Sequence, residues 1–190
     1  LDSRTLSIIK SEITRITNTF ISDYDVLNTF CPKEDEINFC GFESLIKENK
    51  IVVLNMNIAK YKNLSKIIAA YLKLDFQSEV LIQLSNKKSI SPTVFMCDEY
   101  HEYVTLSDSD FFAQSREAKC INIVATQSYT SLLNTLKDES SVKVILQNLV
   151  NKIWLRTDDI FTIESAQKQI GREDKIKYSR NISENAGETN

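Results

Sequence analysis

The sequence predicts an α/β fold in which a mostly parallel sheet is flanked by helices. Short runs of apolar residues alternate along the chain with longer segments of helical periodicity. The apolar runs are nearly continuous, which is typical of strands that are buried on both faces of a parallel sheet. Because a helix is the usual crossover between parallel strands, this alternation favours parallel pairing. The expected strands are 51–56, 93–97, 121–126 and 152–156.

Helices are expected between and around these runs. From Leu6 to Phe20, apolar residues recur at spacings of three and four, which predicts one amphipathic helix that Thr5 or Ser3 caps. Gly171 follows the last expected helix, in the position at which glycine commonly ends one. The remaining expected helices are 42–48, 64–84, 107–119, 128–136, 140–149 and 159–170.

The composition is that of an ordinary globular domain. We expect residues 1–175 to form a single α/β domain with a helical lead-in at 1–40, and the polar tail at 176–190 to be flexible. The net charge is −3 and no Lys- or Arg-rich run is present, which argues against a freestanding nucleic-acid binder. No apolar run is long enough to span a membrane, so we expect no membrane contact from this segment. The cysteines lack zinc-type spacing and favour a reduced, cytoplasmic chain.

Two adjacent acids, Asp98 and Glu99, directly follow the apolar run 93–97. In parallel α/β sheets, ligands bind beyond the carboxyl ends of the strands, where these side chains would lie. A nucleotide-driven motor needs such a pair: the first acid serves Mg²⁺ through its water shell, and the second polarises the attacking water. The same pattern also occurs as a solvated strand end, and the pair alone does not distinguish the two.

Gln127 stands at the end of the next apolar run, 29 residues after Asp98. An amide at the tip of the strand that follows the acidic one can contact the γ-phosphate or the attacking water and report cleavage. The spacing from Asp98 and Glu99 favours this sensor role over that of a residue that merely starts a helix.

Arg116 precedes the run 121–126. An arginine just before a strand can project from a subunit edge toward the nucleotide of a neighbouring subunit, because its planar charged fork suits phosphate. The alternative is a surface arginine that pairs with Glu117 or faces solvent, and the residues alone favour this alternative. Tyr100, His101 and Tyr103 form an aromatic cluster that suits base stacking, although loop packing explains it equally well. For His101 itself, a solvated loop position is favoured.

Five short motifs lie between residues 93 and 171. They are Val-Phe-Met-Cys-Asp-Glu-Tyr at 94–100, Ser-Arg-Glu-Ala at 115–118, Ile-Val-Ala-Thr-Gln-Ser at 123–128, Asn-Leu-Val-Asn-Lys-Ile at 148–153 and Gln-Ile-Gly at 169–171. By these motifs, residues 93–171 resemble the C-terminal part of the ATPase domain in TraG/TraD-type coupling proteins of conjugation and type IV secretion. Residues 6–20 and 42–57 resemble the same family more loosely.

The resemblance implies a RecA-like fold and specific roles. Asp98 would serve Mg²⁺, Asp98 and Gln127 would contact ATP, Glu99 would be the catalytic base, Gln127 the sensor and Arg116 a finger that acts on a neighbouring subunit. The family often has a small or glycine-rich turn around this arginine, and Glu117 beside Arg116 departs from that pattern. The parent protein is then expected to be a hexameric ATPase at the cytoplasmic face of the bacterial inner membrane. It would move DNA, nucleoprotein or protein substrates to the secretion channel, with a relaxase and channel proteins as partners.

The phosphate-binding loop G-x-x-x-x-G-K-[ST] is absent from the chain, whose three glycines are Gly41, Gly171 and Gly187. Without the amides and lysine of that loop, nothing cradles the β- and γ-phosphates. We therefore expect ATP and Mg²⁺ in the parent protein, and neither tight ATP binding nor hydrolysis by this chain alone. Two alternatives stay open: a catalytically incomplete RecA-like module that recruits relaxase or secretion partners, and a fragment of an FtsK/HerA-like DNA translocase.

Overall fold

Two parallel strands, β1 (Thr93–Cys97) and β2 (Cys120–Val124), form the sheet that the structure describes. The computed structural model describes residues 2–61, 63–85 and 92–172, and within them the fold comprises nine α-helices, two 3-10 helices and these two strands. The strands pair in register from Thr93 opposite Cys120 to Cys97 opposite Val124. Because the two strands run the same way, the residues that follow each of them emerge at the same edge. The predicted α/β class is thus confirmed.

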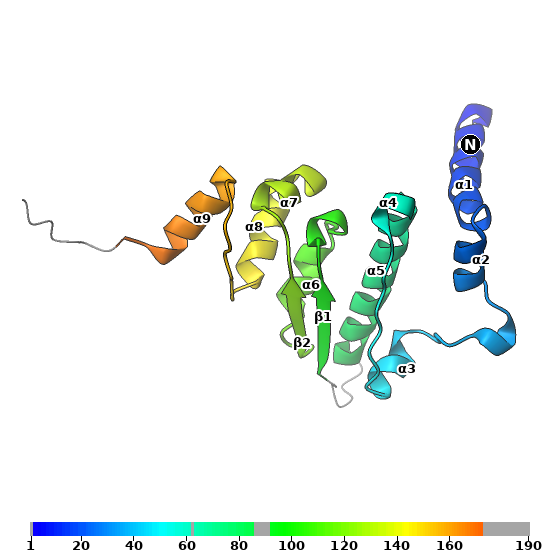
Figure 1. Ribbon diagram of the computed structural model, residues 1–190, viewed down its shortest axis with the longest axis horizontal. Coiled ribbons are helices and arrows are strands. Elements are labelled where there is room, and N and C mark those ends of the chain that lie inside the picture. The colour runs from blue at the N-terminus through cyan, green and yellow to red at the C-terminus, as the bar shows by residue number, and fades with distance from the viewer. Residues whose placement is uncertain (1, 62, 86–91, 173–190) are drawn as a thin grey trace, which may run out of the picture.

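Helices cover one face of this sheet (Figure 1). They are α5 (Asn63–Ser85), α6 (Asp108–Gln114), which connects β1 to β2, and α8 (Glu139–Asn148). Phe95, Cys97 and Val124 point from the strands into the main hydrophobic core. The core residues that the helices supply are Val80 from α5, Phe111 and Phe112 from α6, and Val142 and Ile145 from α8.

The opposite face of the sheet is exposed in the part of the chain that the structure describes. The exposed fractions are 59% for Val94, 76% for Met96, 58% for Ile121 and 49% for Ile123. Since strand residues alternate between faces, these are the side chains that point away from the helices. The prediction that both strands are buried on two faces is therefore wrong for this chain.

The expected strands at 51–56 and 152–156 are absent, and both predictions are wrong. Both segments are coil, and Ile51, Ile153 and Leu155 are 91%, 91% and 83% exposed. A strand is stabilised by backbone hydrogen bonds to a neighbouring strand. Within the described ranges the sheet consists of β1 and β2 alone, so these segments have no strand to pair with. The apolar pattern of these segments is typical of buried strands, but neither segment lies next to β1 or β2 as a further strand.

The N-terminal helices form a second, smaller cluster. Helix α1 (Ser3–Ile21) is confirmed, although Asp2 caps it in place of the expected Thr5 or Ser3 by accepting from the Arg4 amide. Helices α2 (Tyr24–Phe30) and α4 (Ile58–Tyr61) lie beside the start of α5. The buried residues of this second cluster are Val26, Leu64 and Ile68, with Phe20, Met56, Tyr61 and Leu72 packed against them.

The other helices follow the sequence closely. Helices α3 (Phe42–Lys47), α7 (Tyr129–Leu136) and α9 (Ile160–Ile170) confirm the predicted ranges to within one residue. Gly171 ends α9 with φ of 84° and donates its N–H to the Gln167 carbonyl. Helix α6 is shorter than expected, because 115–119 form a turn that enters β2. Helix α2 and the 3-10 helices η1 (Glu34–Glu36) and η2 (Tyr100–Glu102) were not predicted.

The predicted flexible tail at 176–190 lies outside the described residues, as do the ends of the expected single domain. Among the helices that the structure describes, none combines the length and the apolar character that crossing a bilayer requires.

Candidate functional site at the carboxyl edge of the sheet

The ends of β1 and β2 are held together beyond the strands themselves. The Ala125 N–H donates to the Cys97 carbonyl at 2.9 Å, and the Tyr100 N–H donates to the Ala125 carbonyl at 2.8 Å. Through these two bonds, Ala125 extends the pairing between the two chain segments beyond the last residue of β2. They place the loop that carries Asp98 and Glu99 directly against the residues that lead to Gln127.

Glu99 and Gln127 meet across this edge. The Gln127 side-chain amide donates to the two carboxylate oxygens of Glu99, at 3.4 and 3.2 Å. Glu99 has φ of 48° and ψ of 41°, a left-handed conformation that costs a residue with a Cβ about 1–2 kcal/mol. Its side chain is 44% exposed, so it is open to solvent as well as to Gln127. The structure thus brings together two of the residues that the sequence singled out.

Asp98 lies beside this pair. Its Oδ1 accepts the Glu99 N–H at 2.9 Å, and the residue is exposed. Mg²⁺ in nucleotide sites keeps several waters and takes one or two carboxylates together with phosphate oxygens. The exposed carboxylate of Asp98 fits such a role. In the described ranges no group of three or more His, Cys, Asp or Glu side chains gathers around a common point.

Arg116 is not part of this edge. It lies in the turn before β2, at the amino end of that strand, whereas Glu99 and Gln127 lie at the carboxyl ends. The five residues of β2 span about 16 Å at ~3.3 Å per residue and lie between the two places. Arg116 and Glu117 are both exposed and do not form an ion pair. In this chain Arg116 faces solvent and does not reach the acidic pair.

His101 is mostly buried beside the edge, so the prediction of a solvated histidine is wrong. Its side chain is 12% exposed, and its Nδ1 lies 3.5 Å from a Glu99 oxygen and 3.3 Å from the Thr126 hydroxyl. Its Nε2 lies 3.6 Å from Glu102, which also pairs with Lys66 of α5. Hydrogen bonding to Lys66, reinforced by its charge, holds the pKa of Glu102 below its usual value.

Behind the edge lies a buried ion pair that the sequence analysis missed. Asp108 is fully buried and accepts from Lys73 Nζ at 2.7 and 2.6 Å, from Gln77 at 3.0 Å and from the Tyr100 hydroxyl at 2.7 Å. The Thr105 N–H and hydroxyl donate to it as well. Lys73 Nζ also donates to the Tyr103 carbonyl at 2.8 Å. All polar atoms of this cluster are therefore well satisfied, as burial requires.

Burial shifts the pKa values of Lys73 and Tyr100 in this cluster. Burial lowers the pKa of Lys73, and the charge of Asp108 only partly offsets that effect. Burial, followed by the charge of Asp108, raises the pKa of the Tyr100 hydroxyl far above its usual value. Tyr100 is fully buried, so it packs the loop and is not available for base stacking. No clear sign of the pair was present in the sequence: Lys73 and Gln77 lie on the buried stripe of α5, between Ile68 and Val80, but both are residue types that are mostly exposed.

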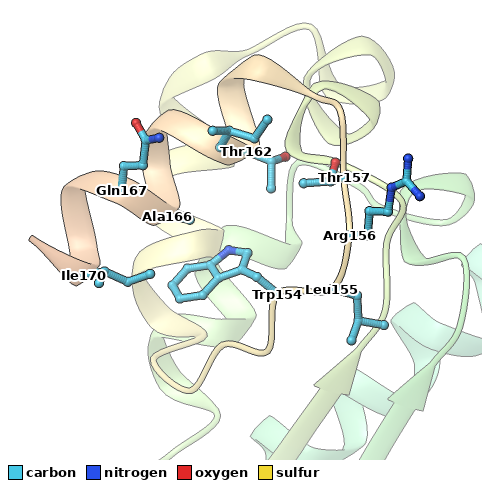
Figure 2. Close-up of a pocket in the computed structure, with 9 residues that line it drawn as sticks. Trp154, Leu155, Arg156, Thr157, Thr162, Ala166, Gln167 and Ile170 are labelled. Carbon is cyan, nitrogen blue, oxygen red and sulfur yellow. The ribbon is translucent and has the colours of Figure 1, made fainter.

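A separate hollow lies between α9 and the segment before it (Figure 2). Trp154, Ala166 and Ile170 line it, and the guanidinium of Arg156 points away from the Trp154 ring. Trp154 is half-buried and donates its ring N–H to the Tyr129 hydroxyl at 3.3 Å. A ligand site usually has a few polar groups that converge on an apolar cavity. This open hollow has no such convergence, so the carboxyl edge is the better candidate site.

Comparison with protein families identifies the family of the chain. Residues 92–190 match the family described as the TraM recognition site of TraD and TraG. The chain belongs to this family. The resemblance to TraG/TraD-type coupling proteins is thereby confirmed for the region that contains β1, β2 and the Glu99–Gln127 contact. Searches of curated proteins and of solved structures gave no significant match.

Proposed function

We propose that this chain provides the acidic edge of an ATP-hydrolysing site in a conjugative coupling protein. The longer protein would use ATP to move DNA, nucleoprotein or protein substrates toward a secretion channel. The observation that carries the proposal is the contact between Glu99 and Gln127 across the ends of two adjacent parallel strands, with Asp98 beside it. Membership of the TraG/TraD family supports it.

Each residue has a role that its geometry permits. Asp98 offers an exposed carboxylate to a Mg²⁺ ion that travels with ATP. Glu99 offers a partly exposed carboxylate that can take a proton from a water molecule. Gln127 holds that carboxylate through its amide, which is also the group that can turn to a phosphate oxygen. When bound, ATP supplies the phosphoanhydride bond whose hydrolysis drives movement.

The remainder of the site would come from outside this chain. The phosphate-binding loop is absent from the sequence, so its amides and lysine would be supplied by another part of the RecA-like domain. Arg116 points to solvent away from its own edge, and in a hexameric ring it would act on a neighbouring subunit's nucleotide. Such a protein would work at the cytoplasmic face of the inner membrane.

Substitution of Glu99 in the full-length protein tests the proposal. Glu99→Gln should lower ATP turnover by about 100-fold or more, because general base catalysis is lost, while ATP binding persists. Glu164→Gln is the matched control: it removes an exposed acid from α9, to which no role in catalysis is assigned, and should leave turnover unchanged. Equal turnover in the two variants would refute the proposal. This chain alone should show no micromolar affinity for Mg-ATP by isothermal titration, and such affinity would contradict the assignment of the phosphate loop to another part of the protein.

The family description also favours a second function, recognition of a relaxosome protein. Residues 92–190 fall in the region described as recognising TraM. We propose that this chain binds the TraM protein of its own conjugation system independently of nucleotide. Titration of TraM into the chain should give saturable binding that Glu99→Gln leaves intact, and an absence of binding at high micromolar TraM would exclude this function for the isolated chain.

A further inference from the structure

The direction of the Glu99 side chain depends on the residue that follows it. Glu99 is in the left-handed region, and Tyr100 is fixed at both of its ends. The Tyr100 N–H donates to Ala125 at 2.8 Å, and its hydroxyl donates to Asp108 at 2.7 Å. The first bond joins the loop to the residue that directly follows β2. The second joins it to α6 and, through Lys73, to α5.

We propose that Lys73, Asp108 and Tyr100 are positioning residues that hold Glu99 against Gln127, an inference that rests on the proposed function. Left-handed residues with a Cβ cluster at functional sites, where the surroundings enforce them. Asn49, Lys119 and Lys137 are also left-handed, but each occupies an exposed turn or helix end where such geometry is common. Glu99 differs because the residue after it, Tyr100, is hydrogen-bonded to Asp108 of the buried cluster.

The chemistry of the cluster fits positioning better than stability alone. A buried ion pair is weak evidence for stability, because the cost of removing two charges from water roughly cancels their attraction. It does fix geometry, since Asp108 must face Lys73 or leave a buried charge unpaired. Asp108 in turn accepts a hydrogen bond from the Tyr100 hydroxyl. The aromatic ring of Tyr100 packs beside Phe112, with 6.0 Å between the ring centres. The position of Glu99 therefore depends on α5 and α6, the two helices behind the sheet that carry Lys73 and Asp108.

Tyr100→Phe is the sharpest test, because it removes one hydroxyl and keeps the ring. Asp108 retains its bonds from Lys73, Gln77 and Thr105, so the fold should survive. Tyr129→Phe is the matched control. It removes the hydroxyl of another buried tyrosine, one that accepts from Trp154 and takes no part in the Lys73–Asp108 cluster. Both variants are made in the full-length protein, with ATP and DNA.

The expected result is a fall in kcat by about 10- to 100-fold for Tyr100→Phe, since small displacements of a catalytic group cost this much. The KM for ATP should stay unchanged, because Tyr100 is buried and cannot touch the nucleotide. Tyr129→Phe should leave kcat unchanged, and the two variants should have similar melting temperatures. Should Tyr100→Phe fail to fold, Gln77→Met removes a neutral hydrogen bond to Asp108 and keeps the ion pair, so it should lower kcat while KM stays unchanged.

The outcomes separate this inference from the function on which it rests. If Glu99→Gln lowers turnover but Tyr100→Phe behaves as Tyr129→Phe does, the positioning role is wrong and the proposed function stands. If Glu99→Gln has no effect on turnover, the proposed function is wrong, and the positioning role that rests on it is wrong as well. A parallel loss of kcat and of melting temperature in Tyr100→Phe would show a merely structural role and overturn the inference.

Discussion

The amide of Gln127 donates to both carboxylate oxygens of Glu99 from the end of the neighbouring strand, at 3.4 and 3.2 Å. The contact joins residues 28 apart in the chain and depends on two local features. The parallel register places the ends of β1 and β2 together, and the left-handed backbone at Glu99 turns its side chain toward β2. This geometry leads to the first prediction.

Glu99→Gly should raise the free energy of unfolding by about 0.5 kcal/mol while it abolishes turnover of the full-length protein. Glycine relieves a left-handed strain of about 1–2 kcal/mol, and the gain is reduced by the added freedom of the unfolded chain and the loss of an exposed hydrogen bond. Lys137→Gly, at the left-handed end of α7, is the control and should stabilise without changing turnover. Urea unfolding measures both. A loss of more than about 1 kcal/mol in Glu99→Gly would contradict the strain argument.

Asp108→Ala should destabilise the chain by about 3–5 kcal/mol, because it leaves the Lys73 ammonium buried without its partner. Asp110 stands two residues later on the same first turn of α6 and is exposed. Asp110→Ala should therefore cost no more than about 1 kcal/mol, the usual effect of a charge at a helix N-terminus. Denaturant unfolding of both variants provides the measurement. Equal losses would mean that the buried pair has no special role in stability.

The free energy of unfolding should fall as the pH rises from 9 toward 11, and Cys97 should account for part of the fall. Burial raises the pKa of the Cys97 thiol from 9.0 to about 11, although Lys73 partly opposes this. In that window the unfolded chain loses the thiol proton and the folded chain keeps it, so unfolding is favoured. The raised pKa of Tyr100 acts in the same direction, whereas the lowered pKa of Lys73 acts against it.

Cys97→Ala isolates the thiol contribution. Its unfolding free energy should decline less steeply than that of the unmodified chain between pH 9 and 11, when both are measured by urea titration at each pH. Parallel curves for the two proteins would show that the thiol titrates alike in both states.

The uncovered face of the sheet should make the isolated chain bind hydrophobic dyes and self-associate. Contiguous exposed apolar patches are rare on monomeric proteins. Ile121→Lys should lower both dye fluorescence and the associated fraction in sedimentation experiments, because Ile121 is on that face and 58% exposed. Leu106→Lys is matched to it, at 57% exposed but away from the strands, and should change neither. A similar effect of the two substitutions would show that the exposed face of the sheet is not the surface that binds dye and self-associates.

Local patterns explain what the sequence predicted well. The helical stripes and the C-terminal glycine of α9 are properties of neighbouring residues, and they gave helix positions to within a few residues. The meeting of Glu99 and Gln127 was also predictable, because parallel strands align their carboxyl ends. The absence of strands at 51–56 and 152–156 was not predictable, because strand formation depends on a neighbouring strand, which a local apolar run does not specify.

Burial of charge was equally hard to foresee. Lys73 reads as a solvated helix residue, and Asp108 reads as a residue of a helix start. Only the packing of α5 against the loop after β1 turns them into partners 35 residues apart. The role of Tyr100 had the same difficulty, because an aromatic residue next to an acidic pair suits both a ligand surface and a packed loop.

Helix α5 joins the two hydrophobic clusters, with Ile68 in the smaller one and Val80 in the larger one. The two positions are about 18 Å apart along the helix, at ~1.5 Å per residue. Regions with few buried contacts open before the rest of a protein. The amides of α1 and α2 should therefore exchange with deuterium while those of α6 and α8 remain protected, and the middle of α5 should mark the boundary between early and late exchange.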